Sequence, residues 1–227
     1  MNFTGNGPGE TWPREAFDLD CRDCARLAIF LEGIRHARPT YHARPVPPFG
    51  DPGAQLLVVG LAPGMHGANR TGRPFTGDHA GILLYRTLHR FGFASHAGSS
   101  DPDDGLALTG CRVTNAVKCL PPQNKPMPAE ITSCNRFLAA EMAHRPPRAV
   151  LALGRIAHVA VLRARGLKVG AYVFAHHALH DLPGGPRLFD SYHCSRYNTQ
   201  TKRLTEAMFA AVVCDIAEFL AAAARRD

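Results

Sequence analysis

Residues 56–81 read LLVVGLAPGMHGANRTGRPFTGDHAG, and the fold is organised around this stretch. Its first four residues, Leu56–Val59, are apolar and half of them are β-branched, which is typical of a strand buried on both faces. The next five, Gly60–Gly64, contain two glycines and a proline, which favour a turn. From residue 80 to residue 91 apolar side chains recur at helical spacing. The stretch therefore predicts a strand, a long loop and a helix.

The loop between this strand and this helix is chemically unusual for a connector. It contains Phe75 and Asp78 together with two arginines, Arg70 and Arg73. A connector of this length without secondary structure is uncommon and is often a binding loop. It also leaves the strand at its carboxyl end, where open α/β folds bind ligands. We therefore expect the loop to form one wall of a pocket.

The rest of the chain alternates between predicted strands and predicted helices. Three further strands are expected at residues 112–117, 149–153 and 187–192. Helices are expected at residues 21–34, 129–144, 157–164 and 205–224. This alternation indicates an α/β fold with a parallel sheet covered on both faces. No repeat divides the chain, so we expect a single domain over residues 1–227.

The composition is that of a soluble globular protein. The chain has 227 residues, of which 45% are hydrophobic and 20% charged, enough to bury a sizeable core. No apolar run approaches the length that spans a bilayer, so we expect no membrane association. The first residues lack the basic start and apolar block of a signal peptide. We expect a cytoplasmic, monomeric protein.

The charge balance is basic. Lysine and arginine outnumber aspartate and glutamate by 26 to 19, which gives a formal net charge of +7. An excess of this sign favours a polyanionic partner, chiefly nucleic acid. The charge alone does not decide the matter, because many arginine-rich proteins are equally basic.

Four of the seven cysteines form two pairs. Cys21 and Cys24 are separated by two residues, and Cys119 and Cys134 lie on either side of a loop flanked by prolines. Four converging thiolates suit a zinc ion or a [4Fe–4S] cluster. Alternatively, the first pair is unliganded and the second consists of small core residues. The spacing leaves both interpretations open, because the second pair is far from zinc-ribbon spacing.

Four other side chains lie in the loop or at strand ends, and each has an ordinary structural explanation. Asp78 could cap the helix that follows it. Asn115 could be a turn residue, Phe75 a core aromatic and His193 a locally hydrogen-bonded imidazole. The turn at Gly154 is expected at the same edge of the sheet. Together, however, a carboxylate, an amide, an aromatic ring and an imidazole are the groups needed to hold and cleave a nucleobase.

Longer motifs resemble those of the fifth uracil-DNA glycosylase family, the UDGb type. They are GLAPGMHGANRTGRPFTGDHAG, VTNAVKC, YHCSRYNTQTKRLT and the two cysteine pairs, and they cover the chain from about Cys21 to Thr205 in the family's order. The resemblance implies a three-layer αβα fold with a central four-stranded parallel sheet. It also implies excision of uracil and other deaminated bases from DNA, which leaves an abasic site for base excision repair.

The resemblance also implies a structural [4Fe–4S] cluster. Its ligands would be Cys21, Cys24, Cys119 and Cys134, and an N-terminal segment of about residues 1–36 would carry the first two.

Roles in the reaction carry over residue by residue. Phe75 would stack on the extruded base, and the Asn115 amide would pair with its edge. His193 would stabilise the anionic base oxygen, and Asp78 would orient or deprotonate the water. Asn115 is counted with the catalytic residues as well as with the base pocket.

The same resemblance assigns the remaining contacts. Ala62 and Gly64 would complete the base pocket. The contacts with DNA are expected from Arg70, Arg73, Ser195, Arg196 and Tyr197, of which Arg196 and Tyr197 could fill the gap left in the base stack.

Three positions differ from residues that are common in uracil-DNA glycosylase motifs. Most other uracil-DNA glycosylase families have a polar, water-activating residue where this chain has Ala62; the UDGb type shares the alanine, and the role passes to Asp78. Where the third motif usually reads His-Pro-Ser, Cys194 replaces the stiffer proline. Lys202 stands where a glycine is common before Arg-Leu-Thr.

Two other functions fit parts of the sequence. A non-catalytic iron–sulfur or zinc protein could bind nucleic acid through basic loops, but this leaves Asp78, Asn115 and His193 unexplained. A nucleotide-binding enzyme would need a GxGxxG or P-loop lysine, which the loop lacks. The motifs leave the lesion range open between uracil alone and a set that includes hypoxanthine, xanthine and oxidised pyrimidines.

Overall fold

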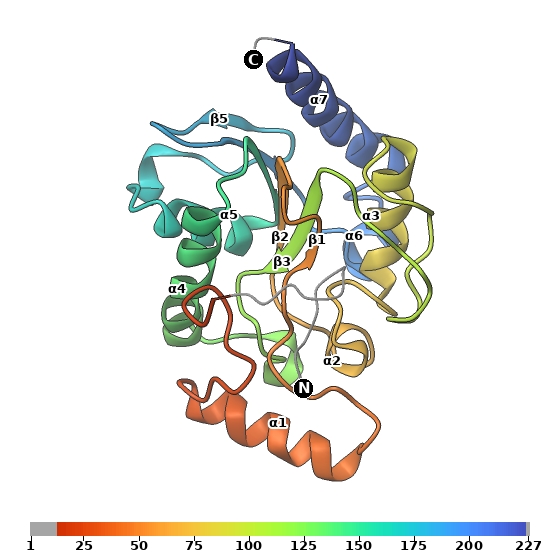
Figure 1. Ribbon diagram of the computed structural model, residues 1–227, viewed down its shortest axis with the longest axis vertical. Helices are drawn as coiled ribbons and strands as arrows, with labels where there is room; N and C mark the ends of the chain where they lie inside the picture. The colour runs from red at the N-terminus through yellow and green to blue at the C-terminus, as the bar shows by residue number, and fades with distance from the viewer. Residues whose placement is uncertain (1–12, 226–227) are drawn as a thin grey trace.

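The computed structural model describes residues 13–225, and a six-stranded sheet forms its centre (Figure 1). The strands lie in the order β1-β3-β2-β4-β6-β5. The four central strands are parallel: β3 (Cys111–Asn115), β2 (Leu56–Gly60), β4 (Ala149–Leu153) and β6 (Arg187–Ser191). A short antiparallel strand closes each edge, β1 (Phe49–Gly50) beside β3 and β5 (Leu179–Asp181) beside β6.

Helices cover both faces of this sheet, which confirms the predicted three-layer αβα fold (Figure 1). On one face lie α3 (His79–Arg90) and α7 (Glu206–Ala224), and on the other lie α4 (Pro128–His144) and α5 (Arg155–Ala164). The shorter helical segments are α2 (Ala68–Thr71), α6 (Arg196–Gln200), η1 (Pro122–Asn124) and η2 (Val169–Ala171). The parallel strands are the four that the sequence predicts. The two edge strands were not predicted, and they make the whole sheet mixed.

β2 lies in the middle of the sheet and contributes side chains to both layers. Leu56 and Val58 pack with α3 and α7, whereas Leu57 and Val59 pack with α4 and α5. A strand buried on both faces has no polar side, which explains the continuous apolar run. In the register with β3, Gly60 pairs with Asn115, so the end of β2 lies beside the first candidate site residue.

The N-terminal part of the described chain lies below the sheet, on the same side as α2 (Figure 1). The helix α1 (Ala25–Ala37) begins directly after Cys24 and buries Leu27, Leu31 and Ile34. It therefore starts later than predicted, with both cysteines of the first pair outside it. Residues 1–12 of the predicted N-terminal segment lie outside the described residues.

The helix α7 is more apolar than expected from the sequence. By length and hydropathy it is the one helix among residues 13–225 that could cross a membrane, contrary to the expectation that no run reaches that length. Its residues Phe209, Val213 and Ile216 are buried against the sheet and α3. The packing of this layer therefore accounts for the apolar face of α7.

A buried ion network connects β3 to α4. The Glu141 carboxylate accepts hydrogen bonds from Nε of Arg112 at 3.0 Å and from Nζ of Lys118 at 3.3 Å. Lys118 also donates to the Thr114 hydroxyl. Both basic side chains are only 1% exposed and the Glu141 side chain is fully buried. The Glu141 carboxylate therefore pairs with two cations inside the protein.

We expect Glu141→Gln to lower the free energy of unfolding by about 3–5 kcal/mol, because it removes the charged partner that Arg112 and Lys118 share inside the protein. Denaturant unfolding followed by circular dichroism measures the loss. The matched control is Glu206→Gln, which breaks the exposed ion pair with Arg86 and should cost less than about 1 kcal/mol. Similar losses in the two variants would contradict the importance of the network.

Candidate active site

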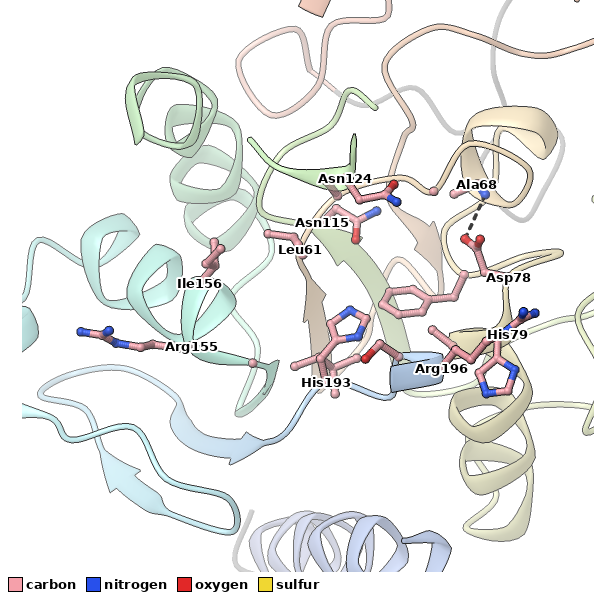
Figure 2. Close-up of a pocket in the computed structure, with 17 residues that line it drawn as sticks. Leu61, Ala68, Asp78, His79, Asn115, Asn124, Arg155, Ile156, His193 and Arg196 are labelled. Atoms are coloured by element: carbon pink, nitrogen blue, oxygen red, sulfur yellow. Dashed lines mark hydrogen bonds between the residues drawn. The ribbon is translucent and has the colours of Figure 1, made fainter. Parts of the chain in front are cut away.

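A pocket of about 560 Å³ opens at the carboxyl ends of the central strands (Figure 2). The four predicted elements meet there: the loop after β2, the end of β3, the Gly154 turn after β4 and the segment after β6. The predicted residues that line it are Ala62, Gly64, Phe75, Asp78, Asn115, His193, Ser195 and Arg196. The structure thus brings the predicted carboxylate, amide, aromatic ring and imidazole into one cavity.

Asp78 occupies the N-cap position of α3 but does not cap this helix with its side chain. Its carboxylate makes no cap hydrogen bond to α3. Instead, Oδ2 accepts a hydrogen bond from the backbone N–H of Ala68, 3.2 Å away across the pocket wall (Figure 2). The carboxylate therefore does not cap α3; it lines the cavity and contacts the first N–H of the short helix α2.

The environment of Asp78 makes it a stronger base than an exposed aspartate. Burial raises the pKa of its carboxyl above the ordinary value. The Ala68 N–H and the nearby Arg70 and His66 side chains oppose this effect in part. A carboxylate with a raised pKa accepts a proton more readily, as a general base must.

The backbone of the loop leaves room for this carboxylate. A Cβ atom at Gly67 would lie 1.9 Å from Cγ of Asp78, and one at Gly64 would lie 2.6 Å from its Oδ1. Real Cβ atoms do not approach other atoms this closely. Any larger residue at position 67 would have to move the Asp78 side chain.

Phe75 is held in a strained backbone conformation. Its φ of 56° lies in the left-handed region, which costs a non-glycine residue on the order of 1–3 kcal/mol and is concentrated at functional sites. The ring is 6% exposed and packs close to Gly60. A Cβ at Gly60 would lie 2.6 Å from Cζ of Phe75 and 2.5 Å from Oδ1 of Asn115. Gly60 therefore lets the aromatic ring and the amide meet at the end of β2.

The Asn115 side chain is directed into the cavity (Figure 2). The residue is only 3% exposed, and its Oδ1 lies close to Gly60 at the end of β2. This amide can donate to and accept from a bound base.

His193 faces Phe75 across the pocket as a neutral ring. The two ring centroids are 6.0 Å apart and the planes differ by 26°. Burial lowers the pKa of His193 to about 4, so the imidazole is uncharged near neutral pH. Its Nδ1 is buried without a hydrogen-bond partner among the described residues. A neutral imidazole in this place can donate one hydrogen bond to an oxygen that gains negative charge.

Comparison with known proteins identifies the family. The family model for the uracil DNA glycosylase superfamily matches residues 47–217. The chain belongs to this superfamily. Type-5 uracil-DNA glycosylases of Thermus thermophilus, Pyrobaculum aerophilum and Mycobacterium leprae are 49%, 40% and 43% identical over 89%, 86% and 83% of this chain, and over 96%, 87% and 86% of their own lengths. A type-4 uracil-DNA glycosylase of Thermotoga maritima is 28% identical over 64% of the chain. The predicted type-5 family is therefore confirmed.

Arg73, one of the residues predicted to contact DNA, is instead part of the interior of this glycosylase. Its side chain is 6% exposed and pairs with Asp104 at 2.7 Å. Its guanidinium also donates to the hydroxyls of Thr76 and Ser99 and to two backbone carbonyls. Because this guanidinium is buried and bound to groups of the protein, we reassign Arg73 to the support of the loop.

The other predicted DNA-contact residues lie at the surface near the pocket. Arg196 is exposed and Tyr197 is 70% exposed, at the start of α6. The Ser195 hydroxyl caps this helix by accepting a hydrogen bond from the N–H of Asn198. Arg70 is partly exposed while its Nε donates to the carbonyl of His66 at 2.8 Å. These side chains are positioned for contacts with a large ligand at the mouth of the pocket.

Several lining residues were not singled out from the sequence. They are Leu61, Ala68, His79, Ala80, Asn124, Leu153, Arg155 and Ile156. His79 joins α3 to α6, since its Nε2 lies 3.0 Å from Oγ1 of Thr199. The proline-flanked loop was a signal for Asn124, and the turn at Gly154 was a signal for Arg155 and Ile156.

Cys194 and Lys202, the two residues after β6 that depart from the usual motif, both fit the local structure. Cys194 is fully buried, and burial raises the pKa of its thiol to about 12, which makes it an inert core residue. Packing thus holds the segment that a proline would otherwise stiffen, and His193 still lines the pocket. Lys202 has a φ of 56°, in the region that favours glycine, which explains why glycine is common at this position.

The four paired cysteines converge beside α1. All four are free thiols, and they surround a small cavity of about 20 Å³ together with Leu27 and Phe137. Burial raises the pKa of Cys119, and the other three thiols raise it further. Burial likewise raises the pKa of Cys134 to about 11. Thiolates at this site therefore need a bound cation to compensate their charge.

We expect Gly67→Ala to displace the Asp78 carboxylate and to lower the free energy of unfolding by about 1–3 kcal/mol, the usual cost of overpacking. A crystal structure and a denaturant titration measure the two effects. Gly33→Ala is the matched control, because this glycine is in α1 and a Cβ atom added to it would have no neighbour within 4 Å. That change should be neutral or stabilise the helix by up to about 1 kcal/mol. An unmoved Asp78 in Gly67→Ala would contradict the close packing.

Proposed function

We propose that this protein is a monofunctional DNA glycosylase that removes uracil from DNA. Membership of the superfamily and the names of the type-5 relatives support this assignment. The observation that carries it is the position of Asp78, whose carboxylate is turned away from the helix it precedes and into the pocket that contains Asn115 and a neutral His193. A nucleic-acid-binding protein without catalysis would have no use for this arrangement.

The first step is extrusion of the target nucleotide from the duplex, which costs a few kcal/mol and is least costly at a mismatch. The ring of Phe75 stacks on the extruded base, and such stacking contributes about 1–3 kcal/mol. The Asn115 amide pairs with the base edge. Arg196 and Tyr197 lie next to the entrance and fill the gap in the stack, while Arg70 contacts the phosphate backbone.

The second step is hydrolysis of the glycosidic bond. As the bond between C1′ and the base nitrogen breaks, its electron pair moves to the base and positive charge builds on the sugar. His193 donates a hydrogen bond to the base oxygen that becomes negative. Asp78 accepts the proton of the water that attacks C1′ and its charge offsets the sugar cation. The products are the free base and an abasic site.

The chemistry of the pocket wall supports a substrate range wider than uracil. Ala62 adds little bulk to this wall. The Asn115 amide presents both a donor and an acceptor, so it can pair with uracil, hypoxanthine or xanthine. We therefore include other deaminated bases among the substrates.

We propose further that Cys21, Cys24, Cys119 and Cys134 hold a structural [4Fe–4S] cluster. The backbone N–H of Lys118 donates to Sγ of Cys134 at 3.3 Å, a contact that tunes thiolate ligands. Among residues 13–225, the four sulfurs are not a group in which all ligand atoms lie within 4.8 Å of one another. Tetrahedral zinc would draw its sulfurs to about 3.8 Å from one another. When bound, the cluster would join α1 to the loop after β3 and to α4.

The central test is Asp78→Asn. We expect this variant to fold and to bind uracil-containing duplex, but to excise uracil at least about a hundredfold more slowly in single turnover, since general base catalysis contributes about 10²–10⁴ in rate. Alkali cleavage of a labelled duplex measures the rate. Asparagine caps helices as well as aspartate does, so near-normal excision would reduce Asp78 to a structural residue.

The pH dependence provides the internal control. The wild-type rate should fall as pH falls through the raised pKa of Asp78, and this acid limb should be absent from Asp78→Asn. Because the pKa of His193 is about 4, this residue should cause no loss of rate as pH rises through 6.5. A wild-type rate that falls as pH rises through 6.5 would show that His193 acts in its charged form.

For the cluster, we expect purified protein to be brown, with broad visible absorbance and about four iron atoms per chain. Cys119→Ala should lose the colour, whereas Cys214→Ala, which changes a cysteine outside the group, should keep it. Colourless protein with one zinc ion per chain would leave the four ligands in place and exclude the iron–sulfur assignment.

A further inference from the structure

Three side chains of types that can bind a metal ion meet outside the candidate active site. His158 comes from α5, His180 from β5 and Asp190 from β6, where the edge hairpin approaches α5 (Figure 1). Their ligand atoms all lie within 4.8 Å of one another, the one such group found among residues 13–225. None of the three lines the candidate active site.

The contacts between His158, His180 and Asp190 are short and largely buried. Nδ1 of His158 lies 2.8 Å from Oδ2 and 2.9 Å from Oδ1 of Asp190, and Nε2 of His180 lies 3.2 Å from the same Oδ2. The other nitrogen of His158, Nε2, lies 3.1 Å from the backbone carbonyl of Tyr172. The side chains of Asp190 and His158 are 0% and 1% exposed, and that of His180 is 15% exposed.

The hydrogen-bonding capacity of His158 does not match its surroundings. Both of its ring nitrogens face oxygens that can only accept, the Tyr172 carbonyl and the Asp190 carboxylate. A neutral imidazole has one N–H, so when Nε2 donates to the carbonyl the lone pair of Nδ1 points at the carboxylate. Two lone pairs at such a distance repel each other. A positive charge between Nδ1 and Asp190 removes the conflict.

We propose that this charge is a divalent metal ion of the zinc type, bound by Nδ1 of His158, Nε2 of His180 and the Asp190 carboxylate. Two imidazoles and one carboxylate are a ligand set that zinc accepts. Metal-binding histidines almost always donate their second N–H to a carbonyl or carboxylate, as His158 does to Tyr172. The ring centroid of Phe174 lies 5.6 Å from that of His158, and the ring centroid of Tyr172 lies 5.7 Å from that of His180. These two aromatic rings shield the group from water.

Such an ion would have a structural role. It would fasten β5 to α5 and to β6, the strand that leads into the segment with His193. The edge strand β5 consists of three residues, of which the two ends are exposed, so hydrogen bonds alone hold it weakly. His180, at the solvent edge, gives the ion a path of entry. The alternative is a second proton on His158 in place of the metal.

Zinc titration of the purified protein, with its cysteine site loaded and loosely bound metal removed by a chelator, decides between the two. We expect isothermal calorimetry to show one equivalent of Zn²⁺ bound and the thermal unfolding midpoint to rise with zinc. The partly exposed ligand variant His180→Gln should bind at least about tenfold more weakly, because loss of a ligand or its support costs about 10–100-fold in affinity. His89→Gln, the same change at an exposed position in α3, should bind as the wild type does.

Cobalt provides a second readout that separates this group from the cysteines. Co²⁺ bound to nitrogen and oxygen ligands gives visible d–d bands without the strong charge-transfer band of a thiolate ligand. We expect such a spectrum in the wild type and its loss in His180→Gln. Binding of no zinc, binding unchanged by His180→Gln, or a thiolate band would overturn the proposal. None of these readouts depends on excision activity.

Discussion

The parallel pairing of β2 with a strand on each side is the constraint on which the rest of the structure depends. β2 pairs with β3 and β4 along its length, and its side chains supply both helical layers. A strand paired on both edges and packed on both faces cannot shift by one residue without breaking both sets of hydrogen bonds and repacking both layers. Its carboxyl end is therefore fixed in space, and with it the register that puts Gly60 beside Asn115.

From that fixed end the loop must return to α3 within a small volume. The result is a wall in which backbone, rather than side chain, contacts the functional groups. Gly60 touches Phe75 and Asn115, and Gly67 touches Asp78. The strain in Phe75 is sustained because the surrounding core fixes its neighbours, for example through the hydrogen bond from the Tyr85 hydroxyl to the Pro74 carbonyl at 2.7 Å. The apolar core thus provides the rigidity that positions a polar site.

The sequence was informative wherever one residue type has one physical explanation. The four central strands could be predicted because apolar runs of that length are buried, and the pocket because their carboxyl ends share one edge. The edge strands could not, since β1 has two residues and β5 exposes its ends. Arg73 and Asp78 show the limit more sharply. A loop arginine is as suited to a phosphate as to the carboxylate of Asp104, and an aspartate before a helix is as suited to a cap as to a pocket. Only the tertiary contacts distinguish these uses.

The glycine-lined wall limits which positions of the pocket can take other side chains. Larger side chains at positions 60, 64 or 67 would collide with Phe75, Asp78 or Asn115, so this half of the cavity has little room for variation. The opposite half is not: Asn124, Arg155 and Ile156 come from a loop and a helix end that no described hydrogen bond ties to Asp78, Asn115 or His193. Relatives that differ in the bases they accept should therefore differ there. The fold thus separates a half whose side chains are fixed by close packing from a half that selection can adjust.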